Sequence, residues 1–412
     1  MNRYANDKPK PNRVETAEVD HDHILRRAIL TLIFVGIAIA SFSYAVWLLN
    51  NSDSGWTEIK VDSTSDVNLG DDFTLEYNLG QSGVSPAAEK KALTPVYSQA
   101  MVNYFRLFDP GNIYKDVNNL YYISCNPKTE IVVDEDLYYV LETLKKYDNR
   151  AIYLGPALTY YTAIFNSTSD LEAKAYDPSK DPEIMAYVNK VAEYAADPES
   201  IDIELLGDNK IILHISDEYK AFCKDNEVTQ LLDLGWLKNA FVADLTAGKL
   251  KEAGLTNGYL SSDDGFTVNL SEDTDFTLSI YDEDGDNIVS VGEYSYKGPR
   301  NIVWLKNFLA TKEDVGNFYM YQDGSEVSYY IKADGTSDTG SCSLYLYGDA
   351  YTSTCADMVL SAYDIFLNAD SNETLDGDLI DKLADAGIYN IRIENGVIYG
   401  NGDIMNQDCK NK

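Results

Sequence analysis

Residues 231–265 read LLDLGWLKNAFVADLTAGKLKEAGLTNGYLSSDDG, and this stretch decides the fold that the sequence predicts. The tripeptide Asp233-Leu234-Gly235 predicts a turn after a short apolar strand. Apolar residues then recur at helical spacing up to Gly254, where the helix is expected to end. A second strand follows and runs into a turn of small and acidic residues. The stretch therefore predicts a strand, a turn, a helix and another strand in close succession.

The flanking sequence predicts helices and strands without a regular alternation. Hydrophobic residues make up 45% and charged residues 24% of the 412 residues, which is typical of a folded protein. Apolar residues at helical spacing predict three helices, at 84–108, 134–148 and 181–197. Short β-like runs bounded by turn residues predict four strands, at 210–216, 276–282, 326–333 and 342–348. Runs of both kinds favour an α+β fold over a doubly wound sheet.

Residues 28–49, AILTLIFVGIAIASFSYAVWLL, carry no charge and predict a transmembrane helix. At 1.5 Å per residue the run spans about 33 Å, enough to cross a hydrocarbon core about 30 Å thick. Arg26 and Arg27 precede it directly, whereas the first basic residue after it is Lys60, so we expect the N-terminus in the cytoplasm. A cleaved signal peptide is the alternative, because residues 38–40 resemble a cleavage site, although the apolar run continues beyond them.

These features predict a single-pass plasma-membrane protein with an extracytoplasmic domain. Its expected segments are a cytoplasmic tail at 1–27, the transmembrane helix at 28–49, a linker with a first strand region at 50–83, and one α+β domain at 84–412. Residues 1–49 hold six basic and five acidic side chains, which leaves 27 basic and 62 acidic side chains, a formal net charge of −35, on the rest of the chain. A field of this sign repels nucleic acid and favours cations or basic partners, while solubility is its simplest explanation.

Two weaker patterns leave alternatives open. The five cysteines include no CxxC spacing, and an extracytoplasmic location would permit a bridge between Cys342 and Cys355. Asp282 to Glu293 places acidic residues at positions one, three, five and twelve of a calcium-loop pattern, but Asn287 stands where that pattern needs glycine. We interpret this stretch as an acidic hairpin turn, with a calcium loop as the alternative.

Several segments resemble the ApbE-like flavin transferases, the FAD:protein FMN transferases, in the order found in that family. The family's central stretch reads approximately D-[LV]-G-G-I-A-K-G-Y-A-x-D, and Asp233 and Asp244 match its two aspartates. The other matching segments are LFDPGNIYKDVNNLYYISCNP (107–127), AIYLGPAL (151–158), DVGNFYMYQDGSEVSYYIKADG (314–335) and ADMVLSA (356–362). The resemblance implies an ApbE-like, T-fold-like α+β domain.

The resemblance also implies an activity and a site. The family transfers FMN from FAD to a Thr or Ser hydroxyl of a target protein and uses Mg²⁺ to neutralise the diphosphate. Asp357, Ser361 and the backbone carbonyl of Trp236 fall on the family's metal ligands, with the first two one helical turn apart. The flavin-nucleotide positions fall on Tyr153, Leu154 and Gly155, expected on one strand, and on Asp233, Asn239 and Ile331.

The sequence departs from the family at several of these positions. Asn239 replaces a lysine, and Ser261-Ser262 replace a glycine pair that lets the backbone approach phosphate. Tyr329 replaces a histidine that would accept the proton of the attacking hydroxyl, so Tyr329 or Asp263 is the candidate catalytic residue.

Two functions follow from the matches and the departures. One is a membrane-anchored FAD:protein FMN transferase-like protein that acts on flavin-acceptor membrane or surface proteins. The other is a catalytically degenerate flavin-binding or scaffold module of the same fold on the cell surface. A third reading, an acidic adhesin or calcium-binding surface domain, rests only on charge and the 282–293 stretch.

Overall fold

The computed structural model describes part of the chain and divides it into two units, Met1–Asp53 and Ser54–Lys412. In the first unit the described residues of the predicted membrane span are helical, and most of their large apolar side chains are exposed. The remainder of that span and the predicted tail at 1–27 fall outside the described residues. Within the described part of the chain, no helix is both long enough and apolar enough to cross a membrane. The described residues are 29, 33–37, 39–44, 54–62, 68–272, 274–284, 287–306, 318–338, 343–368, 377–394 and 397–401.

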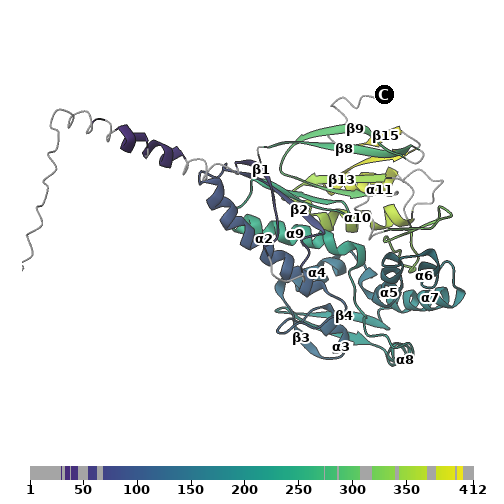
Figure 1. The fold of residues 1–412 in the computed structure, drawn as a ribbon. Helices are drawn as coiled ribbons and strands as arrows, with labels where there is room; N and C mark the ends of the chain where they lie inside the picture. Colours follow the sequence, from purple (N-terminus) through teal and green to yellow (C-terminus); the bar gives the residue numbers. More distant parts are fainter. Residues whose placement is uncertain are drawn as a thin grey trace, which may run out of the picture. The chain divides into compact units, whose positions relative to one another are not determined.

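An eight-stranded sheet organises the second unit, in the order β1-β2-β6-β7-β10-β13-β14-β15. Strands β1, β2, β13 and β15 of this sheet are labelled in Figure 1. Neighbouring strands are antiparallel throughout. The strands are β1 (Gly55–Ile59), β2 (Phe73–Leu79), β6 (Gly258–Ser262), β7 (Phe266–Asn269), β10 (Arg300–Leu305), β13 (Ser343–Asp349), β14 (Ile388–Glu394) and β15 (Val397–Gly400). The sheet thus joins strands from both ends of the unit around the central stretch of the sequence.

Each face of this sheet is covered by different elements, because successive side chains of a strand point to opposite faces. Val303 and Leu346 belong to the larger core with the helices, whereas Ile302 and Tyr345 belong to a smaller core with the β8–β9 hairpin. Helices α2 and α9 pack on each other, and α9 packs on α10. These elements are α2 (Pro86–Phe108), α9 (Lys238–Glu252), α10 (Cys355–Asn368), α11 (Gly377–Asp385), β8 (Asp275–Asp284) and β9 (Asn287–Lys297).

A second group of elements is built around a three-stranded antiparallel sheet in the order β3-β5-β4. The side chains of Asp134 and Asp181 cap α4 and α7, which confirms the helices predicted at 134–148 and 181–197. Figure 1 shows α5, α6 and α7 grouped together. The group consists of α3 (Leu120–Cys125), β3 (Glu130–Val132), α4 (Glu135–Lys146), η2 (Ala151–Leu154), α5 (Gly155–Phe165), α6 (Asp170–Lys174), α7 (Pro182–Ala196), β4 (Ile201–Gly207), β5 (Lys210–Ile215) and α8 (Asp217–Asp225).

Three strand predictions are corrected by the structure. Residues 151–155 form η2 and the start of α5, because Pro156 suits the first turn of a helix and cannot donate to a sheet. The short strand expected before Asp233 is absent from the described residues, and a short 3₁₀ helix, η3 (Gly235–Leu237), follows instead. The run at 326–333 forms a strand only at β12 (Glu326–Ser328), which pairs with β11 (Phe318–Met320), and Ile331 makes an isolated bridge with Ser337.

The acidic stretch at 282–293 lies in the β8–β9 hairpin, where Asp284 pairs with Asn287. The hairpin interpretation of this stretch is therefore confirmed, while residues 285 and 286 lie outside the described residues. Cys355 is a free and buried cysteine, so the disulfide left open by the sequence is not formed, and Cys342 also lies outside the described residues.

Candidate functional site

A cavity of about 570 Å³ lies at the start of α9. Its walls come from the end of α2, from α5, from η3 and the start of α9, from the β6–β7 turn and from the segment after β12. Elements far apart in the sequence therefore meet here. Six of the residues that the sequence predicts for the site line this cavity, namely Asp233, Trp236, Asn239, Asp263, Tyr329 and Ile331.

The cavity wall is partly aromatic and partly acidic. Its aromatic side chains offer flat surfaces on which a planar ring system can stack. Lys238 is the one basic residue among the described residues of the lining, and its Nζ lies 3.8 Å from Asp72 Oδ2. The aromatic lining residues are Phe105, Phe108, Tyr161, Phe165, Trp236 and Tyr329, and the acidic ones are Asp72, Asp109, Asp233, Asp263 and Asp264.

Asp264 is the most buried carboxylate of the wall, with 5% of its surface exposed. Its Oδ1 accepts a hydrogen bond from Ser262 Oγ at 2.5 Å and its Oδ2 accepts one from Asn239 Nδ2 at 3.0 Å. Burial raises the pKa of Asp264 to about 6. Asn239 thus holds Asp264, and its own Oδ1 is buried without a hydrogen-bond partner among the described residues.

Asp233 fixes the turn that leads into η3. Its Oδ1 accepts from the Gly235 amide at 2.9 Å, and its Oδ2 accepts from Gln230 Nε2 at 2.9 Å. Burial raises the pKa of Asp233 above its ordinary value. Gly235 has a φ of +53°, and a Cβ there would lie 3.1 Å from Leu158 Cδ1, so the turn requires glycine.

Trp236 joins this turn to α10 through aromatic contacts. Its indole stacks on Tyr363 of α10 with ring centroids 5.5 Å apart and meets Tyr330 edge-on at 5.0 Å. The Tyr363 hydroxyl donates to the carbonyl of Ile331 at 3.0 Å. The Tyr329 hydroxyl donates to the carbonyl of Asp264 at 3.3 Å, so the two candidate catalytic residues, Tyr329 and Asp263, both lie at the β6–β7 turn.

Solved structures of similar fold support the architecture around this cavity. The ApbE protein of Thermotoga maritima matches with a TM-score of 0.53 and 11% identity, over 84% of this chain and 96% of that chain. The flavin transferase ApbE of Vibrio cholerae matches with a TM-score of 0.52 and 13% identity, over 80% of this chain and 92% of that chain. This chain has an ApbE-like fold. A point mutant of the Vibrio cholerae protein matches with a TM-score of 0.51.

The likeness to ApbE proteins is one of fold at low sequence identity. No family model matches the sequence, and no curated protein matches it either. The sequence segments that resemble the family predict a mixed α+β, ApbE-like domain, and this prediction is confirmed for the fold. The roles of single residues stay predictions.

The predicted metal carboxylate, Asp357, lies in the first turn of α10 and does not line the cavity at the start of α9. Its Oδ1 accepts from Tyr147 Oη at 2.7 Å and from Lys146 Nζ at 3.0 Å, and its Oδ2 accepts from Thr354 Oγ1 at 3.0 Å. Burial alone would raise the pKa of Asp357, but these hydrogen bonds outweigh it and hold the pKa below its ordinary value. Ser361 lies one turn further along α10.

Asp244, the second aspartate of the central match, positions the start of α10. Its two carboxylate oxygens accept the backbone N–H groups of Cys355 and Ala356 at 2.9 and 2.8 Å. Burial raises the pKa of Asp244 to about 7. This contact from α9 fixes the helix turn that carries Asp357.

The donor set at the start of α10 fits the chemistry of Mg²⁺. A carboxylate and a hydroxyl one helical turn apart are hard oxygen ligands, and Mg²⁺ commonly uses one or two protein groups with waters and substrate phosphate. Across the described ranges, no group of three or more His, Cys, Asp or Glu side chains gathers as a metal site. The predicted set does not need such a group, because it has one carboxylate.

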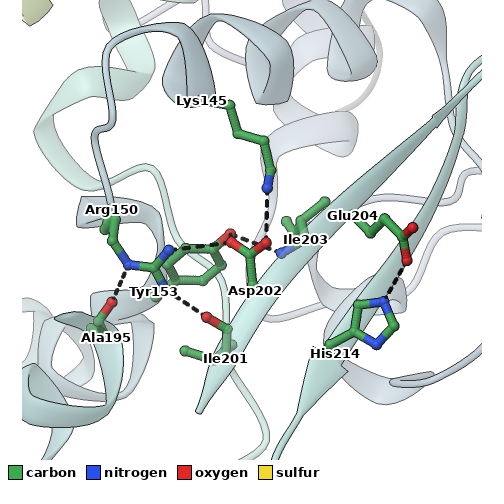
Figure 2. A network of polar contacts seen from close by, with 9 residues as sticks. All are labelled: Lys145, Arg150, Tyr153, Ala195, Ile201, Asp202, Ile203, Glu204 and His214. Carbon is green, nitrogen blue, oxygen red and sulfur yellow. Dashed lines mark hydrogen bonds and ion pairs between the residues drawn. The ribbon is translucent and has the colours of Figure 1, made fainter. Parts of the chain in front are cut away.

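The predicted flavin positions on η2 and α5 do not line the cavity at the start of α9. Tyr153 is buried, and its hydroxyl donates to Asp202 at 3.2 Å and accepts from the Ile203 amide at 2.9 Å (Figure 2). Leu154 is buried beside a separate cavity of about 220 Å³ that Tyr147 also lines. A Cβ on Gly155 would lie 2.9 Å from the backbone of Leu231, so glycine allows the chain before Asp233 to pass close by.

Three residues of this region were missed by the sequence interpretation. Asp264 stands next to Asp263 in the same acidic turn, so its proximity was a usable signal. Lys146 and Tyr147 end the helix at 134–148 and contact a residue more than 200 positions away, for which the sequence holds no local signal.

Proposed function

We propose that this protein is a membrane-anchored, extracytoplasmic protein of the FAD:protein FMN transferase type. It binds FAD in the cavity at the start of α9 and transfers FMN to a Thr or Ser hydroxyl of a flavin-acceptor membrane or surface protein. The observation that carries the proposal is that six predicted site residues, which come from the two segments 231–265 and 314–335, line this one cavity. The similar solved structures from Vibrio cholerae are named flavin transferases.

The residues of the site have distinct parts in this reaction. The aromatic wall would stack on the isoalloxazine ring, and the turn held by Asp233 would present its backbone to the nucleotide. The acceptor hydroxyl attacks the phosphorus of the FMN half, a new phosphoester bond forms, the diphosphate bond breaks, and AMP leaves. Tyr329 or Asp263 would receive the proton of the hydroxyl.

Mg²⁺ is the cation expected in this proposal. Asp357, Ser361 and the carbonyl of Trp236 would hold it, and it would neutralise charge on the diphosphate when bound. Stacking of Trp236 on Tyr363 supports this grouping, because it packs the turn before α9 against the helix that carries Asp357 and Ser361.

The membrane anchor in this proposal is the uncharged run at 28–49. Its described part is helical and exposes apolar side chains, including Phe34 at 68% and Phe42 at 73% exposure. Side chains of this kind favour a lipid environment over water.

A second candidate function is a flavin-binding or scaffold module that has lost transfer activity. Two contacts favour it. Asn239 is an uncharged amide that donates to Asp264, and the Tyr329 hydroxyl donates to a backbone carbonyl, so neither contact provides a positive charge for the diphosphate or a base for the acceptor hydroxyl. An ApbE-like fold with these contacts would retain the cavity without the chemistry.

The two candidates are separated by incubating the full chain in detergent with FAD, Mg²⁺ and a protein that bears a flavin-acceptor site. Covalent flavin is then read as fluorescence of the acceptor in a denaturing gel, and FAD binding is read from quenching of flavin fluorescence. Labelling supports the transferase. Binding without labelling supports the scaffold module, and absence of binding removes both.

A cavity-filling variant tests where FAD binds. Thr162 is an exposed residue of α5 that lines the cavity, so Thr162→Trp should fill it with little effect on the core and weaken FAD binding at least about tenfold. Thr159→Trp is the matched control, because Thr159 is an exposed residue of the same helix that lines a different cavity. Equal affinities of the two variants would place FAD elsewhere.

A further inference from the structure

We propose that Lys146 competes with a divalent cation for Asp357, so that the end of α4 sets how tightly α10 holds a metal ion. The inference uses the Asp357–Ser361 pair of the proposed function, but cation binding at this pair does not require flavin. It assigns a role to Lys146, which the comparison with ApbE proteins does not point to.

The contact that carries the inference is an ion pair on the oxygen that a cation would need. Lys146 Nζ lies 3.0 Å from Asp357 Oδ1, and Tyr147 Oη lies 2.7 Å from the same oxygen. Thr354 takes the other carboxylate oxygen. Both carboxylate oxygens therefore already accept hydrogen bonds, and the positive charge beside Asp357 is supplied by the protein itself.

The two partners of this ion pair differ in exposure. The Asp357 side chain is 20% exposed, whereas the Lys146 side chain is 63% exposed. The carboxylate is held by its helix and by Thr354, so it stays in place, while the lysine reaches it from solvent on a flexible stem. An exposed ion pair of this kind is weak enough for a cation to displace it.

An ammonium and a divalent cation cannot share this oxygen, because like charges a few ångströms apart repel. With Lys146 displaced, Asp357 would still face the hydroxyl groups of Tyr147 and Thr354. Carboxylate and hydroxyl oxygens are the ligand type that Mg²⁺ and Mn²⁺ prefer. The lysine therefore lowers the affinity of the site for a cation without removing the site.

The experiment measures Mn²⁺ binding to the full chain in detergent, by the electron paramagnetic resonance signal of free Mn²⁺ and without flavin. Lys146→Met removes the competitor, and we expect about tenfold tighter binding at one site. Lys145→Met is the matched control, since it removes the same charge from the adjacent residue, whose ammonium pairs with Asp202 instead. This control should bind Mn²⁺ like the wild type.

Asp357→Asn identifies the site, because Mn²⁺ also binds elsewhere on a strongly acidic chain. The tighter class of sites seen with Lys146→Met should vanish in the Lys146→Met/Asp357→Asn double variant, with folding checked by circular dichroism. Equal affinities of Lys146→Met and the wild type, or a gain that survives Asp357→Asn, would overturn the inference. If the gain in Mn²⁺ affinity depends on Asp357 but the protein fails to bind FAD, the inference is upheld and the proposed function is rejected.

Discussion

The network around Asp202 and the cavity wall around Asp264 accommodate a carboxylate in opposite ways. Asp202 is 27% exposed and receives Lys145, Arg150 and the Tyr153 hydroxyl at 2.8 to 3.2 Å (Figure 2). Asp264 is 5% exposed, and its side-chain donors within the described residues are the neutral Ser262 and Asn239.

The difference indicates which carboxylate serves structure and which serves a site. A carboxylate paired with two cations ties together the elements that bring them, here α4, the start of η2 and β4. A buried carboxylate with neutral donors keeps a strongly shifted pKa, a feature that clusters at functional sites. The burial of Asp264 beside a cavity therefore marks it as a candidate site residue more clearly than the neighbouring sequence does.

Breaking the network around Asp202 should cause the largest change in the free energy of unfolding. Arg150 donates to the carbonyls of Ala195 and Ile201 at 2.7 and 2.6 Å and to Asp202 at 3.2 Å. Arg150→Met leaves these acceptors without their partner, and we expect a loss of about 3 kcal/mol in the free energy of unfolding, measured by urea denaturation. A loss below about 1 kcal/mol would show that the network does not hold the elements together.

Neutralising the cavity carboxylate should change how stability depends on pH. The folded pKa of Asp264, about 6, lies above its ordinary value of 3.8, so in that window the native state holds a proton that the unfolded state has lost. Its contribution to stability is therefore lost as pH rises through about 4 to 6. Asp264→Asn should gain roughly 2 kcal/mol relative to the wild type between about pH 4 and pH 7.

Urea denaturation at several pH values measures this change. Asp217→Asn removes one charge at a side chain that is 97% exposed and serves as the control. If the free energies of unfolding of Asp264→Asn and the wild type differ by the same amount at every pH, the pKa of Asp264 is not shifted. Asp264 and Asp202 would then not differ in the way described.

The smallest effect is expected at the exposed edge of the network. Lys145 is 38% exposed and makes one hydrogen bond to Asp202, which keeps Arg150 as its second cation. Lys145→Met should therefore cost about 0.5 kcal/mol, measured in the same denaturation series. A loss as large as that of Arg150→Met would mean that the two cations act as one unit.

Helices with clear capping residues were predictable from the sequence, but short apolar runs were not. Asp134 and Asp181 precede helical spacing, so α4 and α7 were expected and are present. The run at 151–155 is apolar in the same way as a strand, and Pro156, which favours a helix start, was the signal that should have decided it.

The cavity was predictable only through the order of its motifs. Asp233, Asn239 and Tyr329 were matched one by one, and the fold brings them to the same cavity. The partners of Asp357 could not be predicted, because α4 and α10 meet only through the tertiary packing of elements far apart in sequence.

The acidic lining of the cavity also determines the composition of the solvent beside it. Five aspartates and one lysine enrich cations and deplete anions in the water at its mouth. A negatively charged nucleotide that enters this water therefore does so together with its counterions. Dissolved salt, which weakens most nucleotide complexes by screening attraction, would here ease entry by screening repulsion.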